Sequence, residues 1–388
     1  MNEFQCRVPK VLFGSGRIES LGVLASELGH KAFLAVDPYI DSSDLADRLV
    51  RGLDRASVTT TRYSKIEPDP DCFAVDEAAE ITRKNACTSV IAVGGGSAID
   101  FGKGVAVVAA NPGTCWQYTR RTDHTPKIPG PDTLPVIAVP TTAGTGSEAT
   151  HFAVFTNPKI REKSTIVSDR IMPRIALVDP ELTFSCPRQL TALTGVDVLA
   201  HSLEAFINIK ASPFAKMVAI EAIHLVGRYL VRTVKDGEDR EARENMAWAS
   251  TLAGIAIAHS NPTLPHALGQ AAGGFIHVPH GASVAACLPH IVRLSYDADP
   301  ASFAELAAAL DPAARDLPLN QRAERSADLL EQLFRDIDLK VRFSDFGLKE
   351  EHIPRITQIA LTGYSTGISL HPKQLDGAGI EEIYRACL

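Results

Sequence analysis

The sequence predicts an N-terminal α/β domain with a mostly parallel sheet, followed by an all-α C-terminal domain. Up to about residue 185, short apolar runs alternate with amphipathic stretches, as strands alternate with helices in α/β proteins. After Cys186-Pro187, long helical periodicities follow one another, and the alternation typical of strands is nearly absent. We therefore predict two domains, residues 1–186 and residues 187–388.

Six apolar runs in the first half are predicted strands, and helical patterns at 40–53 and 72–85 lie between some of them. The predicted strands are residues 11–13, 32–36, 58–63, 89–93, 135–139 and 175–178. Alternation of this kind implies parallel strands covered by helices. Residues 152–155 and 163–167, separated by the polar turn Asn157-Pro158, predict a separate hairpin.

The second half has apolar residues at helical spacing through most of its length, which predicts seven helices. They are residues 189–207, 213–234, 239–259, 283–294, 300–310, 320–336 and 379–387. Within the first half, the Pro-rich stretch 126–135 is a predicted exposed loop.

Composition excludes several classes of protein. With 388 residues, the chain is long enough for two domains that each bury a core. The net charge of −7 provides no basic stripe for nucleic acid, and no apolar run approaches the roughly 20 residues of a membrane span. The seven cysteines are scattered without a Cys-x-x-Cys pair, and the N-terminus lacks the features of a signal peptide. We expect a cytoplasmic protein with reduced cysteines.

A glycine-rich loop, Gly-Gly-Gly-Ser at 94–97, follows the predicted strand 89–93 and precedes a helical pattern. Glycines let the backbone approach a phosphate closely, and the free N–H groups and dipole of a helix N-terminus hold its charge. Ser97 can add a hydroxyl donor. The loop favours phosphate binding over the alternative, a tight strand-to-helix turn without a ligand.

A second loop, Pro-Thr-Thr-Ala-Gly-Thr-Gly-Ser-Glu at 140–148, follows the strand 135–139. Its small and hydroxyl side chains permit close approach of a polar ligand, although a solvated turn has the same composition. Both loops lie at the C-terminal ends of strands, where open α/β sheets bind ligands. Asp37 also ends a strand; its carboxylate can accept from ribose hydroxyls and repel a 2′-phosphate, or it can be a capping residue ahead of Pro38.

Four residues of the second half have the chemistry of a divalent-metal site: Asp197, His201, His266 and His280. Asp197 and His201 are four residues apart, which places both on one face of a helix. One carboxylate with three imidazoles suits Fe(II) or Zn(II) and leaves a coordination position for a substrate. A lone Asp-x-x-x-His pair or a buried histidine has ordinary structural explanations, so the prediction depends on the two segments together.

These motifs together resemble the iron-containing, group III alcohol dehydrogenase family, over nearly the whole chain. The motifs that carry the resemblance lie at 13–16, 94–100, 140–148, 178–183, 197–201, 279–281 and 380–388. The resemblance implies an N-terminal dinucleotide-binding domain with a Rossmann-like sheet, a helical metal-binding domain and an active-site cleft between them. It implies a homodimer. The implied reaction is hydride transfer between NAD(H) and a small primary alcohol or aldehyde, with Fe(II) or Zn(II) as Lewis acid.

The resemblance also assigns roles by position. The implied metal ligands are Asp197, His201, His266 and His280. Of the implied cofactor-binding residues, Asp37 favours NAD over NADP, and Gly94, Gly95, Gly96 and Ser97 bind the pyrophosphate. Asp100 is implied to lie close to the cofactor, and Lys163 at the ribose. The residues implied to line the nucleotide cleft are Thr141, Thr142 and Ser147.

The sequence departs from the family at a proton-relay position. Many members carry a histidine four residues after the third ligand, where this chain has Gln270. His277 lies nearby and is a candidate catalytic replacement, or a plain loop residue. His151 falls where the family faces substrate, although a hairpin histidine bonded to backbone is equally compatible. The basic segment 118–124 suits a solvated loop or an anionic substrate.

Several alternatives stay open at this point. The chain could reduce a functionalised carbonyl, such as a 4-hydroxybutyrate-type substrate, a phosphono- or sulfo-aldehyde, or maleylacetate. A dehydroquinate-synthase-like or glycerol-dehydrogenase-like enzyme is disfavoured by the 140–148 loop. From a different class, a catalytically silent NAD- or metal-binding protein is supported only by Gln270. The donor set suits both iron and zinc.

Overall fold

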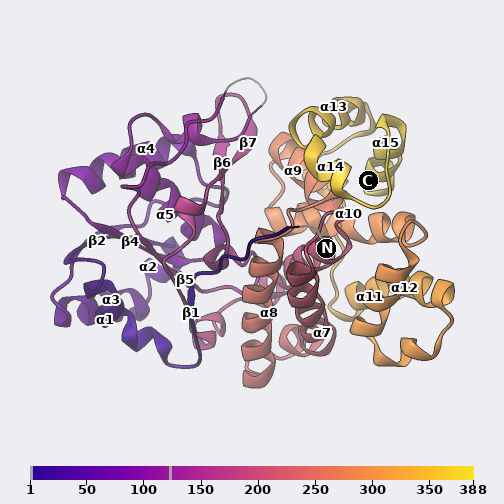
Figure 1. The fold of residues 1–388 in the computed structure, drawn as a ribbon, viewed down its shortest axis with the longest axis horizontal. Coiled ribbons are helices and arrows are strands. Elements are labelled where there is room, and N and C mark those ends of the chain that lie inside the picture. The colour runs from indigo at the N-terminus through magenta and orange to yellow at the C-terminus, as the bar shows by residue number, and fades with distance from the viewer. Residues whose placement is uncertain (1–2, 122–124) are drawn as a thin grey trace. The chain divides into compact units, whose positions relative to one another are not determined.

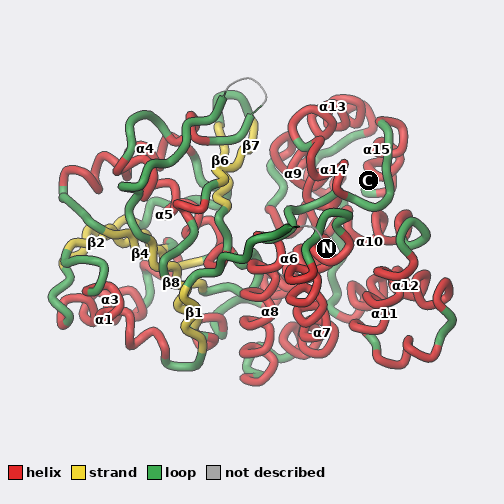
Figure 2. Tube along the Cα trace, viewed as in Figure 1, coloured by secondary structure: helices red, strands yellow, loops and turns green. Residues whose placement is uncertain are grey.

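The computed structural model describes residues 3–121 and 125–388 of the chain. The described chain forms two compact units. The sheet unit comprises Arg7–Thr142 and Gly146–Phe184. The helical unit consists mainly of Ser185–Leu388 and also includes Ala143–Thr145. Figure 2 shows that the strands belong to the first of these units. The division into domains at 186/187 stays a prediction, because compactness does not show that either part folds alone.

The predicted parallel sheet is confirmed. Its strands run in the order β1-β8-β5-β4-β2-β3, and every neighbouring pair is parallel. The strands are β1 (Lys10–Phe13), β2 (Lys31–Val36), β3 (Thr59–Tyr63), β4 (Ser89–Gly94), β5 (Val136–Pro140) and β8 (Ile175–Val178). The predicted hairpin forms as β6 (Phe152–Asn157) and β7 (Glu162–Val167).

Alternation along the strands divides the sheet unit into two cores. In β2, Phe33 and Ala35 belong to one apolar cluster, whereas Ala32, Leu34 and Val36 belong to the other. Because both faces are covered, these strands are continuous apolar runs, as expected of a parallel sheet. The pairing of β4 with β5 places Gly94 beside Pro140. The two predicted ligand loops therefore follow the carboxyl ends of two neighbouring strands, on the same side of the sheet.

Helices cover this sheet on both sides (Figure 1). They are α1 (Leu21–Ser26), α2 (Pro38–Asp41), α3 (Asp44–Arg55), α4 (Cys72–Lys84) and α5 (Gly96–Ala110). The prediction of a single helix at 40–53 is wrong, because the helical conformation is interrupted between the end of α2 and the start of α3. The hydroxyls of Ser42 and Ser43 bond to the carbonyls of Tyr39 and Ile40 and close the turn there.

The helical unit contains ten α-helices among its described residues. They are α6 (Arg188–Ile207), α7 (Pro213–Lys235), α8 (Arg240–Ala258), α9 (Leu264–Ile276), α10 (His280–Ser295), α11 (Pro300–Leu310), α12 (Leu319–Asp336), α13 (Ile353–Gly363), α14 (Ser365–Leu370) and α15 (Gly377–Ala386). One apolar core lies mainly among α6, α7, α8, α11 and α12, and a second among α9, α10 and α13–α15 (Figure 1). The unpredicted α9 contains Pro265 and three glycines, which are poor helix formers.

Helix α6 is the central helix of this unit. By length and composition alone it is apolar enough to cross a membrane, yet 78% of its most apolar stretch is buried inside the protein. The prediction that no apolar run reaches this length is therefore wrong for α6. Its apolar composition is accounted for by burial among α7, α8 and α10, with Val196, Leu199 and Leu203 in the core.

Candidate metal centre and cofactor loop

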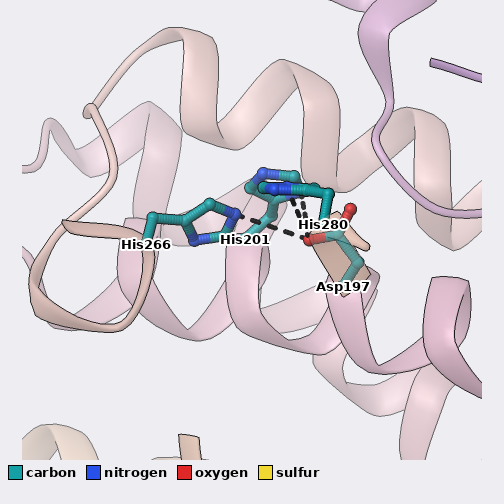
Figure 3. A group of neighbouring side chains, drawn as sticks. All are labelled: Asp197, His201, His266 and His280. Atoms are coloured by element: carbon teal, nitrogen blue, oxygen red, sulfur yellow. Dashed lines mark ion pairs between the residues drawn. The ribbon is translucent and has the colours of Figure 1, made fainter. Parts of the chain in front are cut away.

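The structure brings together the four residues that the sequence grouped as metal ligands. Asp197 and His201 lie one turn apart on α6, His266 lies in the first turn of α9, and His280 begins α10. One ligand atom from each lies within 4.8 Å of the others. Figure 3 shows the three imidazoles gathered around the carboxylate of Asp197.

The donor atoms face one another without bonding to one another. The Asp197 Oδ1 atom lies 3.4 Å from His266 Nε2, 3.5 Å from His280 Nε2 and 3.9 Å from His201 Nδ1. Among the described residues, Asp197 Oδ1, His201 Nδ1 and His266 Nε2 are buried with no hydrogen-bond partner. Each such atom costs about 1–3 kcal/mol. A divalent cation would satisfy all three at once, so these residues fit the metal that the donor set predicts.

Charges at this cluster are set by burial and by the neighbouring carboxylates. Burial lowers the pKa of His201 to about 4, although Asp197 opposes the shift. Burial also acts to lower the pKa of His266, but Glu204 and Asp197 outweigh it and raise the pKa to about 10. Burial acts to raise the pKa of Asp197, but His201 and His280 hold it well below its usual range. His266 thus lies between the carboxylates of Glu204 and Asp197.

Glu204 is a site residue that sequence reasoning missed. It is fully buried on α6, seven residues after Asp197, and its Oε1 atom contacts His266 Nδ1. Its Oε2 atom accepts from the backbone N–H of Thr263 at 2.5 Å. Glu204 thereby binds the first turn of α9 to α6. The spacing of seven residues on one helix face was the available signal, but it does not reveal the partner on α9.

A buried histidine lies behind Glu204. His371 has no exposed surface; its Nε2 atom lies 2.8 Å from Ser295 Oγ and its Nδ1 atom lies 3.3 Å from Thr263 Oγ1. Burial lowers the pKa of His371 to about 4, although Glu204 opposes the shift. No local pattern signals His371, because its partners come from α10 and from the residue before α9.

The lowered pKa of His371 predicts acid sensitivity. The unfolded chain takes up this proton near pH 6.5, whereas the folded chain takes it up only near pH 4. Between these values the unfolded state binds more protons, so stability falls as pH falls through this window. We expect His371 to contribute a loss of about 2 kcal/mol between pH 7 and pH 5.

Urea unfolding at the two pH values measures this loss. The variant His371→Gln should lose about 2 kcal/mol less stability on acidification than the wild-type chain does. The control His224→Gln removes a partly exposed histidine of α7 and should follow the wild type. If His371→Gln and the wild type lose equal stability, burial of a neutral His371 is not the cause.

At Gly94, the first glycine of the loop, the surrounding protein leaves no room for a side chain. Gly94 has a φ of +149°, and a Cβ atom there would lie 2.7 Å from the Cβ atoms of both Asp37 and Ala98. Asp37 also donates its backbone N–H to the carbonyl of Val93. Its side chain caps α2 by accepting from the N–H of Tyr39 at 2.9 Å. Asp37 is thus a helix cap in this structure, and its role toward a ribose stays a prediction.

The two predicted loops touch each other. Thr141 donates its N–H to the carbonyl of Gly94 at 3.0 Å. The Oγ1 atom of Thr142 lies 3.5 Å from where a Cβ of Gly95 would stand. Helix α5 begins at Gly96, and no side chain from the described residues caps its N-terminus. Free N–H groups at the start of a 15-residue helix are a suitable place for a phosphate.

Asp100 and Ser147 contact protein groups. The Ser147 hydroxyl donates to Asp100 Oδ1 at 2.6 Å, and Asp100 Oδ2 accepts from the N–H of Val154 at 2.8 Å. The fully buried Lys103 donates to Ser147 Oγ at 2.9 Å and to the carbonyl of Phe152 at 2.7 Å. These contacts hold the second loop and the β6–β7 hairpin on α5. Contact of Asp100 or Ser147 with a cofactor stays a prediction.

Lys163 and Ser97 are linked through a residue that the sequence did not single out. The Nζ atom of Lys163 lies 2.8 Å from Asp69 Oδ2, and Asp69 donates its N–H to Ser97 Oγ at 3.2 Å. Asp69 has a φ of +56°, in the left-handed region that non-glycine residues seldom adopt. The flanking prolines signal a turn at Asp69, but they do not signal its position between Lys163 and Ser97.

Two predicted histidines lie outside the metal cluster. His277 is exposed at the C-terminal end of α9 with a φ of +54°, which accords with a loop residue. His151 packs its ring against Phe152, with the centroids 4.2 Å apart, and its carbonyl accepts from the N–H of Ser168. Catalysis by His277 and substrate contact by His151 stay predictions. Gln270 follows His266 by one turn on α9.

The basic segment at 118–124 is described up to Arg121, and residues 122–124 lie outside the described ranges. Arg121 pairs with Glu162 at 2.5 Å, and its guanidinium lies 5.0 Å from the ring centroid of Trp116. The charge of Arg121 is therefore compensated within the sheet unit.

Comparison with known proteins gives consistent matches along the chain. The family "Iron-containing alcohol dehydrogenase" matches residues 9–180, and "Fe-containing alcohol dehydrogenase family, C-terminal" matches residues 191–388. The 1,3-propanediol dehydrogenase of Citrobacter freundii is 35% identical over 98% of each chain. The NAD-dependent methanol dehydrogenase of Bacillus methanolicus is 32% identical over 92% of this chain and 93% of its own.

Solved structures agree with the sequence matches. An archaeal halo-thermophilic alcohol dehydrogenase from a Red Sea brine pool has a TM-score of 0.94 and 34% identity, with 100% of both chains covered. Family matches along both halves, together with relatives above 30% identity at nearly full length, show one ancestry for the whole chain. The chain belongs to the iron-containing alcohol dehydrogenase family and is an oxidoreductase.

Proposed function

We propose that this chain transfers a hydride between NAD(H) and a small primary alcohol or its aldehyde, with Asp197, His201, His266 and His280 as the ligands of a divalent metal. The observation that carries the proposal is the convergence of three buried, unpartnered atoms from Asp197, His201 and His266. In a protein that binds no metal, buried polar atoms are normally hydrogen-bonded, and three unsatisfied atoms in one place would have no explanation.

We propose Fe(II) as the metal, with Zn(II) as the alternative, because both accept this mixture of one carboxylate and three imidazoles. When bound, the metal supplies Lewis acidity toward the substrate. The chain's own part is to hold the donors in place. Glu204 fixes the ring of His266, and Asp197 supplies the negative charge that a cation needs at a buried position.

We propose that the cofactor pyrophosphate binds at the start of α5. The support is the contact between the loops at 94–97 and 140–148 and the uncapped N-terminus of α5 among the described residues. Asp37 follows β2 beside this loop, where a carboxylate favours NAD over NADP. Lys163 reaches the same loop through Asp69 and is proposed at the ribose.

The compartment and the assembly are also proposals. All seven cysteines lie in described parts of the chain and none forms a disulfide, which supports a reducing cytoplasmic location. A homodimer is the expectation that comes with the family. Neither proposal is needed for the chemistry at the metal centre.

Neutral aldehydes are favoured over anionic ones as substrates. The strongest feature for an anionic substrate was the basic segment, but Arg121 already pairs with Glu162 and lies over Trp116. Among the described residues, His151 is the one histidine predicted to face substrate. A single imidazole can donate a hydrogen bond to a neutral hydroxyl as well as to a carboxylate, so its presence does not require a charged substrate.

The test is anaerobic oxidation of NADH by Fe(II)-reconstituted protein, with butanal and succinic semialdehyde as four-carbon substrates that differ in charge. We expect kcat/KM for butanal to exceed that for the anion by about tenfold or more, which corresponds to about 1.4 kcal/mol. Turnover of the anion alone would replace the proposal with a dedicated acid-aldehyde reductase. Binding of NADH without turnover of any carbonyl would support a silent binding protein.

A further inference from the structure

A buried hydrogen-bond chain runs behind the metal cluster and ends at His266. Its members are Glu204, Thr263, His371 and Ser295, which we call the Glu204 chain. All four are less than 1% exposed. They come from α6, from the residue before α9, from the residue after α14 and from the last turn of α10. A buried polar chain of this length is costly unless every group is satisfied.

The chemistry of the groups fixes the direction of every bond. A carboxylate can only accept, so Thr263 Oγ1, 3.3 Å from Glu204 Oε2, donates its proton to Glu204. The same hydroxyl oxygen must then accept from His371 Nδ1, 3.3 Å away. Since burial lowers the pKa of His371 to about 4, the ring is neutral near pH 7; its Nε2 atom then has no proton and accepts from Ser295 Oγ at 2.8 Å. One arrangement of protons satisfies the whole chain.

The other end of the chain fixes His266. Because Glu204 Oε1 accepts, the Nδ1 atom of His266 must carry a proton. In the neutral ring, the Nε2 atom then has the free lone pair, and this is the atom that faces Asp197 Oδ1. Nδ1 without a proton would leave two acceptors in contact. The chain therefore selects the tautomer that can bind a cation.

The backbone around Thr263 is held by the same helix. Asn208, just after α6, donates from its side-chain amide to the carbonyls of Ser260 at 2.8 Å and Asn261 at 3.1 Å. Glu204 Oε2 also lies 3.5 Å from the N–H of His266. The start of α9 is thus fixed to α6 at several points. If only the Glu204 carboxylate is removed, the hydrogen bonds from Asn208 to the backbone remain. The loss should therefore affect the orientation of the His266 ring more than the stability of the protein.

We propose that the Glu204 chain is a positioning device that sets the metal affinity of the protein by holding His266 in its metal-binding tautomer and orientation. This proposal rests on the proposed metal site. It assigns to that site a support that extends beyond Glu204, the direct partner of His266, through the three residues Thr263, His371 and Ser295. Carboxylate partners of ligating histidines elsewhere contribute about 10–100-fold to metal affinity.

The test measures Zn(II) and Co(II) dissociation constants by chelator competition, with the metal-free melting temperature and the Co(II) absorption spectrum as separate readouts. We expect Glu204→Gln to weaken metal binding about 10–100-fold and to alter the Co(II) spectrum. Thr263→Val, which removes the hydroxyl but keeps the shape, should weaken it by a smaller factor. Thr263→Ser, which keeps the hydroxyl, should bind like the wild type.

The matched control is Ser202→Ala. Ser202 is fully buried on α6, and its hydroxyl bonds within the helix to the carbonyl of Val198 at 2.7 Å. The control should leave the dissociation constants unchanged. The inference is overturned if Glu204→Gln and Thr263→Val bind metal like the wild type, or if Thr263→Ser binds as weakly as Thr263→Val. If the wild type itself binds neither metal, the proposed metal site fails instead.

Discussion

The variant His266→Ala is expected to lose its metal and more than about a hundredfold of its kcat/KM, because losing a ligand exceeds the 10–100-fold effect of losing a ligand's partner. The truncation removes one of three imidazoles that converge on Asp197 Oδ1 and leaves Glu204 buried without its partner. Metal content by mass spectrometry and NADH oxidation with a short aldehyde measure the two effects.

The control for this variant is His290→Ala. His290 is an exposed histidine on α10, the helix that also begins with His280, and it lies outside the cluster of four. We expect the control to keep its metal and its turnover. Normal turnover by a metal-free His266→Ala protein would contradict the ligand assignment, whereas loss of activity by both variants would indicate a general effect of histidine removal on this unit.

Much of the fold followed from local patterns. Strands such as β2 and β4 are buried on both faces, so each appears in the sequence as an uninterrupted apolar run that ends in a glycine or an aspartate. The break between α2 and α3 did not follow, because Ser42 and Ser43 bond to the backbone of the preceding turn. Helix α9 was missed because tertiary packing overrides its poor propensity.

The candidate site was predictable in its ligands and not in its support. Asp197 and His201 share a helix face at a spacing that the sequence shows directly. Glu204 lies on the same face, but its partner His266 is 62 residues further along the chain. His371 contacts Thr263 across 108 residues. No local pattern carries contacts of this kind, because a buried bond between distant segments depends on the packing of whole helices.

At the cofactor loop, alanine substitution of the first two glycines is expected to affect different properties: the stability of the protein at Gly94 and the affinity for NADH at Gly95. At Gly94 the backbone has a φ of +149°, and a Cβ would stand 2.7 Å from the side chains of Asp37 and Ala98. Strain and overpacking each contribute about 1–3 kcal/mol. We therefore expect Gly94→Ala to lower the free energy of unfolding by roughly 2–6 kcal/mol, as measured by urea denaturation.

At Gly95 the same substitution meets no obstacle within the sheet unit. Its φ is −73°, and the nearest atom to an added Cβ would be Thr142 Oγ1, at an ordinary 3.5 Å. The added methyl would instead occupy the space at the start of α5 that we assign to the pyrophosphate. We expect Gly95→Ala to fold like the wild type and to bind NADH at least about tenfold more weakly, because a phosphate needs close approach to the backbone at this position.

Fluorescence titration of NADH measures the affinity, and Gly52→Ala provides the control. Gly52 lies in α3, and apart from the adjacent backbone of that helix no described atom lies within 4 Å of an added Cβ there. Alanine at an open helix position should add up to about 1 kcal/mol of stability and leave NADH binding unchanged. If Gly95→Ala binds NADH as tightly as the wild type, the pyrophosphate does not lie on this loop. The stability of Gly94→Ala would then reflect a steric constraint alone, because its cause lies between Gly94, Asp37 and Ala98 and does not require a cofactor.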